Sequence, residues 1–130
     1  MIARVKDIQT LDSLNIVKFE FNNMIFKMMS LDLNSDVKVG KYVELLVKPT
    51  NIIISKKFID DISLSNQALA KITDIRNGEL LSSISLQIAD TNLESIITKE
   101  SSIKLDLKKD NEVNILIKAS DLSILRVLND

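Results

Sequence analysis

Two short phrases that join a lysine to a small hydroxyl residue recur in the chain, each after an alternating apolar run. They read Val47-Lys48-Pro49-Thr50-Asn51-Ile52 and Ile117-Lys118-Ala119-Ser120-Asp121-Leu122. Ammonium and hydroxyl groups donate hydrogen bonds, which are the interactions that a bound anion requires. Because one phrase occurs twice, we predict that the chain contains two copies of one structural unit.

The residue composition excludes several kinds of chemistry. The 130-residue chain contains no Cys, His or Trp, which excludes disulfide scaffolds, thiolate nucleophiles, Ser-His-Asp triads and His/Cys zinc sites. Its Asp, Glu and Lys residues form no recognisable acid-base constellation, so we expect a protein that is not an enzyme. Single-stranded nucleic acid requires a basic groove with stacking aromatic residues. With 4% aromatic residues and a net charge of -1, the chain is not expected to bind nucleic acid directly.

The lengths of the apolar segments bear on the cellular compartment of the protein. The sequence starts without the long apolar stretch of a signal peptide, and no apolar run reaches membrane-spanning length. A chain without cysteine is also compatible with a reducing compartment. We therefore expect a cytoplasmic protein with no membrane partner.

Alternation of apolar and polar residues predicts short strands in both halves of the chain. The alternating apolar positions are Val17, Phe19 and Phe21, Val43, Leu45 and Val47, Ile84, Leu86 and Ile88, and Val113, Ile115 and Ile117. This period of two is typical of half-buried strands and sends Lys48 and Lys118 to the face opposite the core. We expect an all-β chain of two small, partly open barrels, residues 1–57 and 63–130, joined by a charged linker.

A short helical turn is predicted in each module. In the second module, Thr98 is a favourable N-cap, and Ile103 and Leu105 are expected to point inward. The counterpart in the first module begins at Ser30, where we expect at most one turn. The helix that begins after Thr98 would add unpaired amides that suit an oxyanion.

Three phrases of the second half are Ser63 to Ile72, Ile97 to Ser101 and Leu116 to Asp121. Their order and spacing resemble the molbindin, or Mop/TOBE, family of molybdate-binding domains. The first half looks like a degenerate copy, so the whole chain is similar to tandem di-Mop proteins and to the effector half of molybdate-responsive regulators. The resemblance implies two tandem OB-like β-barrels in a homo-oligomer, a dimer or a trimer. It also implies molybdate or tungstate bound at module interfaces, and no organic cofactor.

The resemblance assigns candidate oxyanion contacts by position. In the second half these are Ser63, Ser65, Asn66, Thr98, Ser101, Lys118, Ala119 and Ser120, and in the first half Ser30, Lys48 and Thr50. Ser65 stands where the family usually has Arg, which removes a forked donor. Pro49 stands where Ala119 stands in the second phrase and offers no backbone N–H. We therefore expect unequal sites in the two halves.

Each candidate also has an ordinary structural interpretation. Exposed lysines are normally solvated, Thr98 and Ser101 fit a helix cap, and Ser63 to Asn66 fits the end of a polar linker. Two functions remain open. The chain could bind molybdate or tungstate for molybdenum storage or homeostasis, or it could be a molybdate-sensing regulatory module that lacks its own DNA-binding domain and acts through a protein partner.

Overall fold

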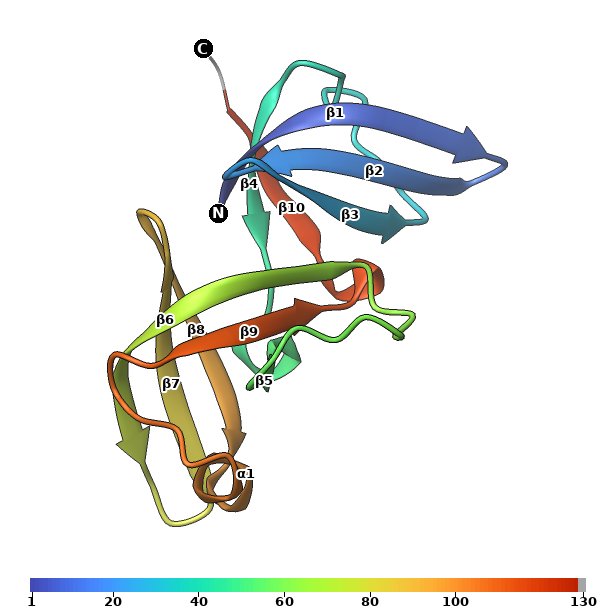
Figure 1. Ribbon diagram of the computed structural model, residues 1–130. Coiled ribbons are helices and arrows are strands. Elements are labelled where there is room, and N and C mark those ends of the chain that lie inside the picture. Colours follow the sequence, from blue (N-terminus) through green and yellow to red (C-terminus); the bar gives the residue numbers. More distant parts are fainter. Residues whose placement is uncertain (129–130) are drawn as a thin grey trace. The chain divides into compact units, whose positions relative to one another are not determined.

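The computed structural model describes residues 1–128 and consists mainly of antiparallel β-strands, as the alternation predicts. The chain divides into two compact units. The first is formed by Met1–Val47 together with the segment from Lys118 onward, and the second by Lys48–Ile117. Each unit contains one five-stranded sheet, and each sheet is strongly curled (Figure 1).

The first unit has the strand order β10-β4-β1-β2-β3. Its strands are β1 (Ile2–Leu11), β2 (Leu14–Phe21), β3 (Met24–Ser30), β4 (Tyr42–Leu46) and β10 (Ser123–Val127). A 3-10 turn, η2 (Ala119–Asp121), precedes β10 and packs against β3.

The second unit repeats this order as β5-β9-β6-β7-β8. Its strands are β5 (Ile53–Ser55), β6 (Asn66–Asn77), β7 (Leu81–Ile88), β8 (Thr91–Thr98) and β9 (Glu112–Ile117). A 3-10 turn, η1 (Pro49–Asn51), precedes β5 and packs against β8, and the short helix α1 (Lys99–Lys104) follows β8.

The last strand of each sequence repeat belongs to the sheet of the other repeat. After β4 the chain enters the second unit, where β5 pairs with β9, and after β9 it returns to the first unit, where β10 pairs with β4. In Figure 1 the red β10 accordingly lies with the blue and cyan strands of the first unit. The predicted modules 1–57 and 63–130 and the compact units are therefore different divisions of the chain, because the repeats exchange their terminal strands.

Alternating side chains form a separate core in each unit. In the first unit the inward positions include Val17, Phe19, Phe21 and Phe26, and the rings of Phe21 and Phe26 lie 5.5 Å apart between centroids. In the second unit they include Ile84, Leu86, Ile88, Val113 and Ile115. The side chains that alternation placed inward are buried except Val47, which follows the end of β4 and is only half-buried. Lys48 and Lys118 are exposed as expected.

Loop geometry shows that the two units are copies of one design. β1 bulges between Val5 and Asp7, and β6 bulges between Ile72 and Asp74. At each bulge, the loop that precedes β4 or β9 makes a reciprocal pair of backbone hydrogen bonds with the bulged strand. Val5 N–H donates to the Lys41 carbonyl, and Gly40 N–H donates back to Val5; Ile72 bonds with Asn111 and Asp110 in the same way. Gly40, with φ of 93°, occupies a turn position in this loop that requires the left-handed backbone conformation.

The prediction for the helical segment was correct at its start and wrong about its buried face. Thr98 is the N-cap of α1, but Ile103 is 64% exposed and Leu105 is only half-buried. Ser102 and Leu107 are the buried side chains of this segment. The helix has only six residues, so the chain has already left it when Leu107 turns toward the core.

Candidate functional site

The two lysine phrases fold in the same way. Lys48 and Lys118 are the N-caps of η1 and η2, with φ and ψ of -68° and 137° and of -66° and 144°, respectively. Three residues further on, the N–H of Asn51 donates to the Lys48 carbonyl at 2.8 Å, and the N–H of Asp121 donates to the Lys118 carbonyl at 2.9 Å. Each turn thus presents one exposed lysine and one exposed hydroxyl, that of Thr50 or Ser120.

In the second unit, a buried hydrogen bond anchors η1 to β8. The hydroxyl of Ser95 donates to the carbonyl oxygen of Ile52 at 2.7 Å, directly after η1. The phrase with Lys48 and Thr50 therefore lies in the same unit as Thr98 and Ser101, although it comes from the other repeat.

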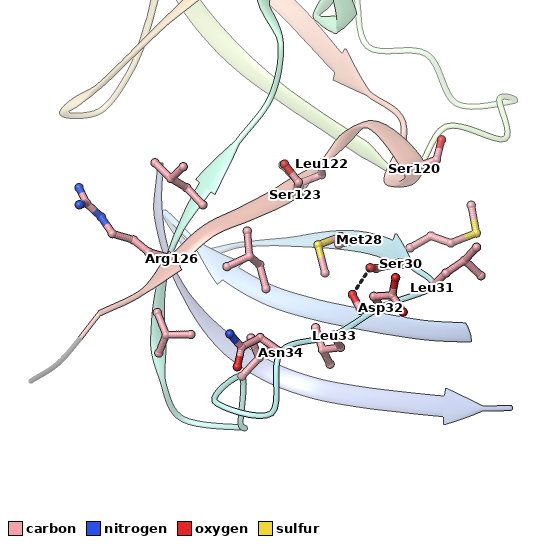
Figure 2. Close-up of a pocket in the computed structure, with 15 residues that line it drawn as sticks. Met28, Ser30, Leu31, Asp32, Leu33, Asn34, Ser120, Leu122, Ser123 and Arg126 are labelled. Atoms are coloured by element: carbon pink, nitrogen blue, oxygen red, sulfur yellow. Dashed lines mark hydrogen bonds between the residues drawn. The ribbon is translucent and has the colours of Figure 1, made fainter. Parts of the chain in front are cut away.

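In the first unit, Ser30 and Ser120 line one cavity of about 590 Å³ (Figure 2). Met28 and Leu122 are buried in its lining, and Asp32 and Arg126 contribute charged groups. The cavity brings the end of β3 together with the phrase of Lys118, Ala119 and Ser120.

The donor set at this cavity is weak. The Ser30 hydroxyl already donates to the Asp32 carbonyl oxygen, the dashed contact in Figure 2, and the Asp32 carboxylate would repel an anion at short range. Hairpin register also changes the assignment. Counted from the closing pairs Phe21–Met24 and Ile88–Thr91, the residue equivalent to Thr98 is Leu31. An apolar side chain that is 68% exposed therefore replaces the hydroxyl.

Thr98 and Ser101 form a closely connected pair at the start of α1. The N–H of Ser101 donates to Thr98 Oγ1 at 3.1 Å, and Thr98 Oγ1 donates to Ser101 Oγ at 2.9 Å. In this arrangement the cap is complete, and the Ser101 hydroxyl retains a proton for a further acceptor. Capping and anion binding are thus compatible at this position.

An apolar surface surrounds Thr98. Leu80 is 81% exposed, and with Leu81 and Ile103 it lines a shallow cavity of about 560 Å³ that also includes Thr98. Leu80 is held there by its carbonyl oxygen, which accepts from the N–H of Lys99 at 2.8 Å. Clustered exposed apolar side chains of this kind are typical of protein–protein contact surfaces.

The Ser63 to Asn66 element leads directly into β6. Ser63 and Ser65 are exposed, whereas Asn66 is buried and pairs with Ile117, the residue before Lys118. Sequence reasoning did not find the polar residues that support these elements, Ser95, Gln67 and Asn114. The only available signal was Asn114, which interrupts an otherwise apolar strand.

Comparisons with known proteins identify the class to which this geometry belongs. Residues 62–124, within the second half of the chain, match the TOBE domain. A search of curated proteins finds no significant match. None of the helices in the described part of the chain is long and apolar enough to cross a membrane.

The whole chain is similar in structure to the cytoplasmic molybdate-binding protein ModG, in a crystal form with molybdate bound. The TM-score is 0.84 at 20% sequence identity, and the alignment covers 95% of this chain and 92% of ModG. The predicted all-β fold of two tandem OB-like barrels is thereby confirmed.

Proposed function

We propose that this protein binds molybdate or tungstate in the cytoplasm and serves molybdenum storage or homeostasis. The observation that carries the proposal is the identical folding of the two lysine phrases, Lys48 to Thr50 and Lys118 to Ser120, within a fold shared with a molybdate-binding protein. A tetrahedral dianion needs donors that converge from several directions. Lysine ammonium, Ser and Thr hydroxyl and backbone N–H groups supply such donors. Binding, and not catalysis, is the chemistry that these groups offer.

The second-repeat elements carry the larger share of binding in this proposal. The Ser101 hydroxyl has a proton available, and Ser63 and Ser65 are exposed, whereas Ser30 donates internally and Leu31 lacks a hydroxyl. The six-residue α1 contributes through its side chains more than through its dipole, since a helix of this length has a small one. Each charge-assisted bond contributes about 1.5 to 3 kcal/mol net of the water contacts that it replaces.

We further propose that the protein is a homo-oligomer, a dimer or a trimer, and that anions bind where subunits meet. The exposed apolar surface of Leu80, Leu81 and Ile103 next to Thr98 supports this arrangement. The double variant Leu80→Ser/Ile103→Ser should dissociate the oligomer and weaken molybdate binding together, whereas Leu11→Ser, at another exposed apolar residue, should do neither. Sedimentation and titration on the same samples test the link.

Equilibrium titration with molybdate, tungstate and sulfate tests the function itself. We expect molybdate and tungstate to bind at micromolar or lower concentration and sulfate to bind more weakly, because a cavity sized for the larger anions leaves sulfate loosely held. Absence of binding by the first two anions would exclude the proposal. A structure with tungstate would give the number of sites and their ligands.

The regulatory alternative makes a different prediction about partners. If the protein senses molybdate and acts through another protein, affinity capture should retain that partner either with molybdate or without it, but not in both states. Storage predicts no partner in either state. Both functions use the same donor set, so only this experiment distinguishes them.

A further inference from the structure

Hydrogen bonds to its backbone hold the segment that leads to Ser63 and Ser65. Residues 56–62, which we call the strap, have no regular secondary structure, and all of their side chains are exposed. Apolar burial therefore contributes little to holding the strap. Its fixed points must come from polar contacts of its main chain.

Gln67 closes this segment into a loop. Its Nε2 donates to the carbonyl oxygen of Ile59 at 2.8 Å, and its Oε1 accepts from the N–H of Ile59 at 3.2 Å. One side-chain amide thus pairs with both backbone groups of Ile59, as a neighbouring strand would. The loop from Ile59 to Gln67 contains Ser63 and Ser65, so its closure restricts where their hydroxyl groups can lie.

Asn114 supports this closure from β9. Its Nδ2 donates to Gln67 Oε1 at 2.8 Å and to Ser55 Oγ at 3.1 Å, while Ser55 Oγ donates to the Lys57 carbonyl at 2.7 Å. The Asn114 side chain is 0% exposed, and its Oδ1 has no partner within the described part of the chain. A buried polar group with an unsatisfied acceptor is costly. In the first unit, the residue equivalent to Asn114 is Glu44 of β4. It forms an ion pair with Arg126 of β10.

We propose that Gln67, supported by Asn114, is a positioning residue that holds the loop 59–67 closed and presents Ser63 and Ser65 to the oxyanion in a fixed geometry. The inference rests on the proposed oxyanion-binding function. Preorganised donors bind more tightly because less conformational freedom is lost when the ligand arrives.

The test is a double-mutant cycle measured by molybdate titration. Gln67→Met keeps the side-chain length and removes both bonds to Ile59, and we expect it to weaken molybdate binding roughly tenfold. In the Ser63→Ala/Ser65→Ala background the same substitution should cause no further loss, because the residues through which Gln67 acts are already gone. Gln87→Met, on β7 outside the network, is the matched control and should bind as the wild type.

Two further readouts distinguish positioning from general stability. Amide exchange should accelerate in residues 59–66 of Gln67→Met and stay unchanged in β9, with a melting temperature close to that of Gln87→Met. Gln67→Ala provides the same comparison if the Met variant does not fold. Wild-type affinity in Gln67→Met, or an equal loss in both backgrounds, would overturn the inference. A wild-type protein that binds no molybdate would instead overturn the proposed function, and the inference with it.

Discussion

The hydroxyl of Ser95 donates a 2.7 Å hydrogen bond to the carbonyl oxygen of Ile52, and this bond joins the third strand of one repeat to the segment that arrives from the other. Ile52 directly follows η1, so the bond fixes the turn that presents Lys48 and Thr50. Residue for residue, the first unit has Met28 at the place of Ser95, and there Met28 lies with Leu122 in the lining of the cavity. The same connection is therefore polar in one unit and apolar in the other.

Removing the Ser95 hydroxyl should destabilise the protein. Ser95→Ala leaves a buried carbonyl without its donor, and we expect the free energy of unfolding to fall by about 1 to 3 kcal/mol. Urea denaturation followed by circular dichroism measures the change. Ser85→Ala, at a half-buried serine of β7, should change stability by less than about 0.5 kcal/mol. Equal effects of the two variants would contradict the anchoring role.

Lysine substitutions should separate the contributions of the two phrases. Lys118→Ala removes one charge-assisted bond of about 1.5 to 3 kcal/mol, so molybdate affinity should fall roughly ten- to hundredfold. Lys48→Ala should have a smaller effect, because Pro49 offers no N–H and the anion is held less firmly at that phrase. Calorimetric titration provides both values. Lys109→Ala, at an exposed lysine outside the phrases, should leave molybdate affinity unchanged. A comparable loss of affinity in Lys109→Ala would mean that the effect reflects the net charge of the protein and not a direct contact.

Thr98 can be tested as a ligand without losing it as a cap. Aspartate is as good an N-cap as threonine, so Thr98→Asp should keep α1 and the melting temperature. Its carboxylate would face the bound dianion, and molybdate binding should be lost through repulsion. Thr98→Ala should instead cost about 1 kcal/mol of stability. If Thr98→Asp binds molybdate normally, Thr98 acts only as a cap.

Local signals in the sequence predicted the elements, and long-range pairing required the structure. Alternation identifies Val17, Phe19 and Phe21 as one buried face, and a threonine before Lys99 marks the helix start, because both signals are contained in a few adjacent residues. The exchange of β5 and β10 has no such signal. Each is a short strand, and no local pattern within it specifies the sheet that it joins; only the observed pairings show the exchange.

The residue types of the candidate site come from the sequence, whereas their grouping required the structure. The lysine phrases stand out because they repeat, but the exchange places Lys48 with the unit of Thr98 and places Lys118 with the unit of Ser30. Ser30 was predicted as the start of the corresponding turn, whereas hairpin register assigns the place of Thr98 to Leu31. Buried supports such as Asn114 read as isolated polar residues until their partners are known.

The register also suggests how to restore a donor set in the first unit. Leu31 and Asn34 occupy the places of Thr98 and Ser101, so Leu31→Thr/Asn34→Ser recreates that pair beside the phrase of Lys118. We expect the variant to bind more molybdate per chain than the wild type, because a hydroxyl pair replaces an exposed leucine. Tungsten content after gel filtration in tungstate measures the stoichiometry. Asp32 opposes the gain by its charge, and Asp32→Asn in the same background should increase it further. Unchanged stoichiometry in both variants would mean that the first unit lacks more than this pair.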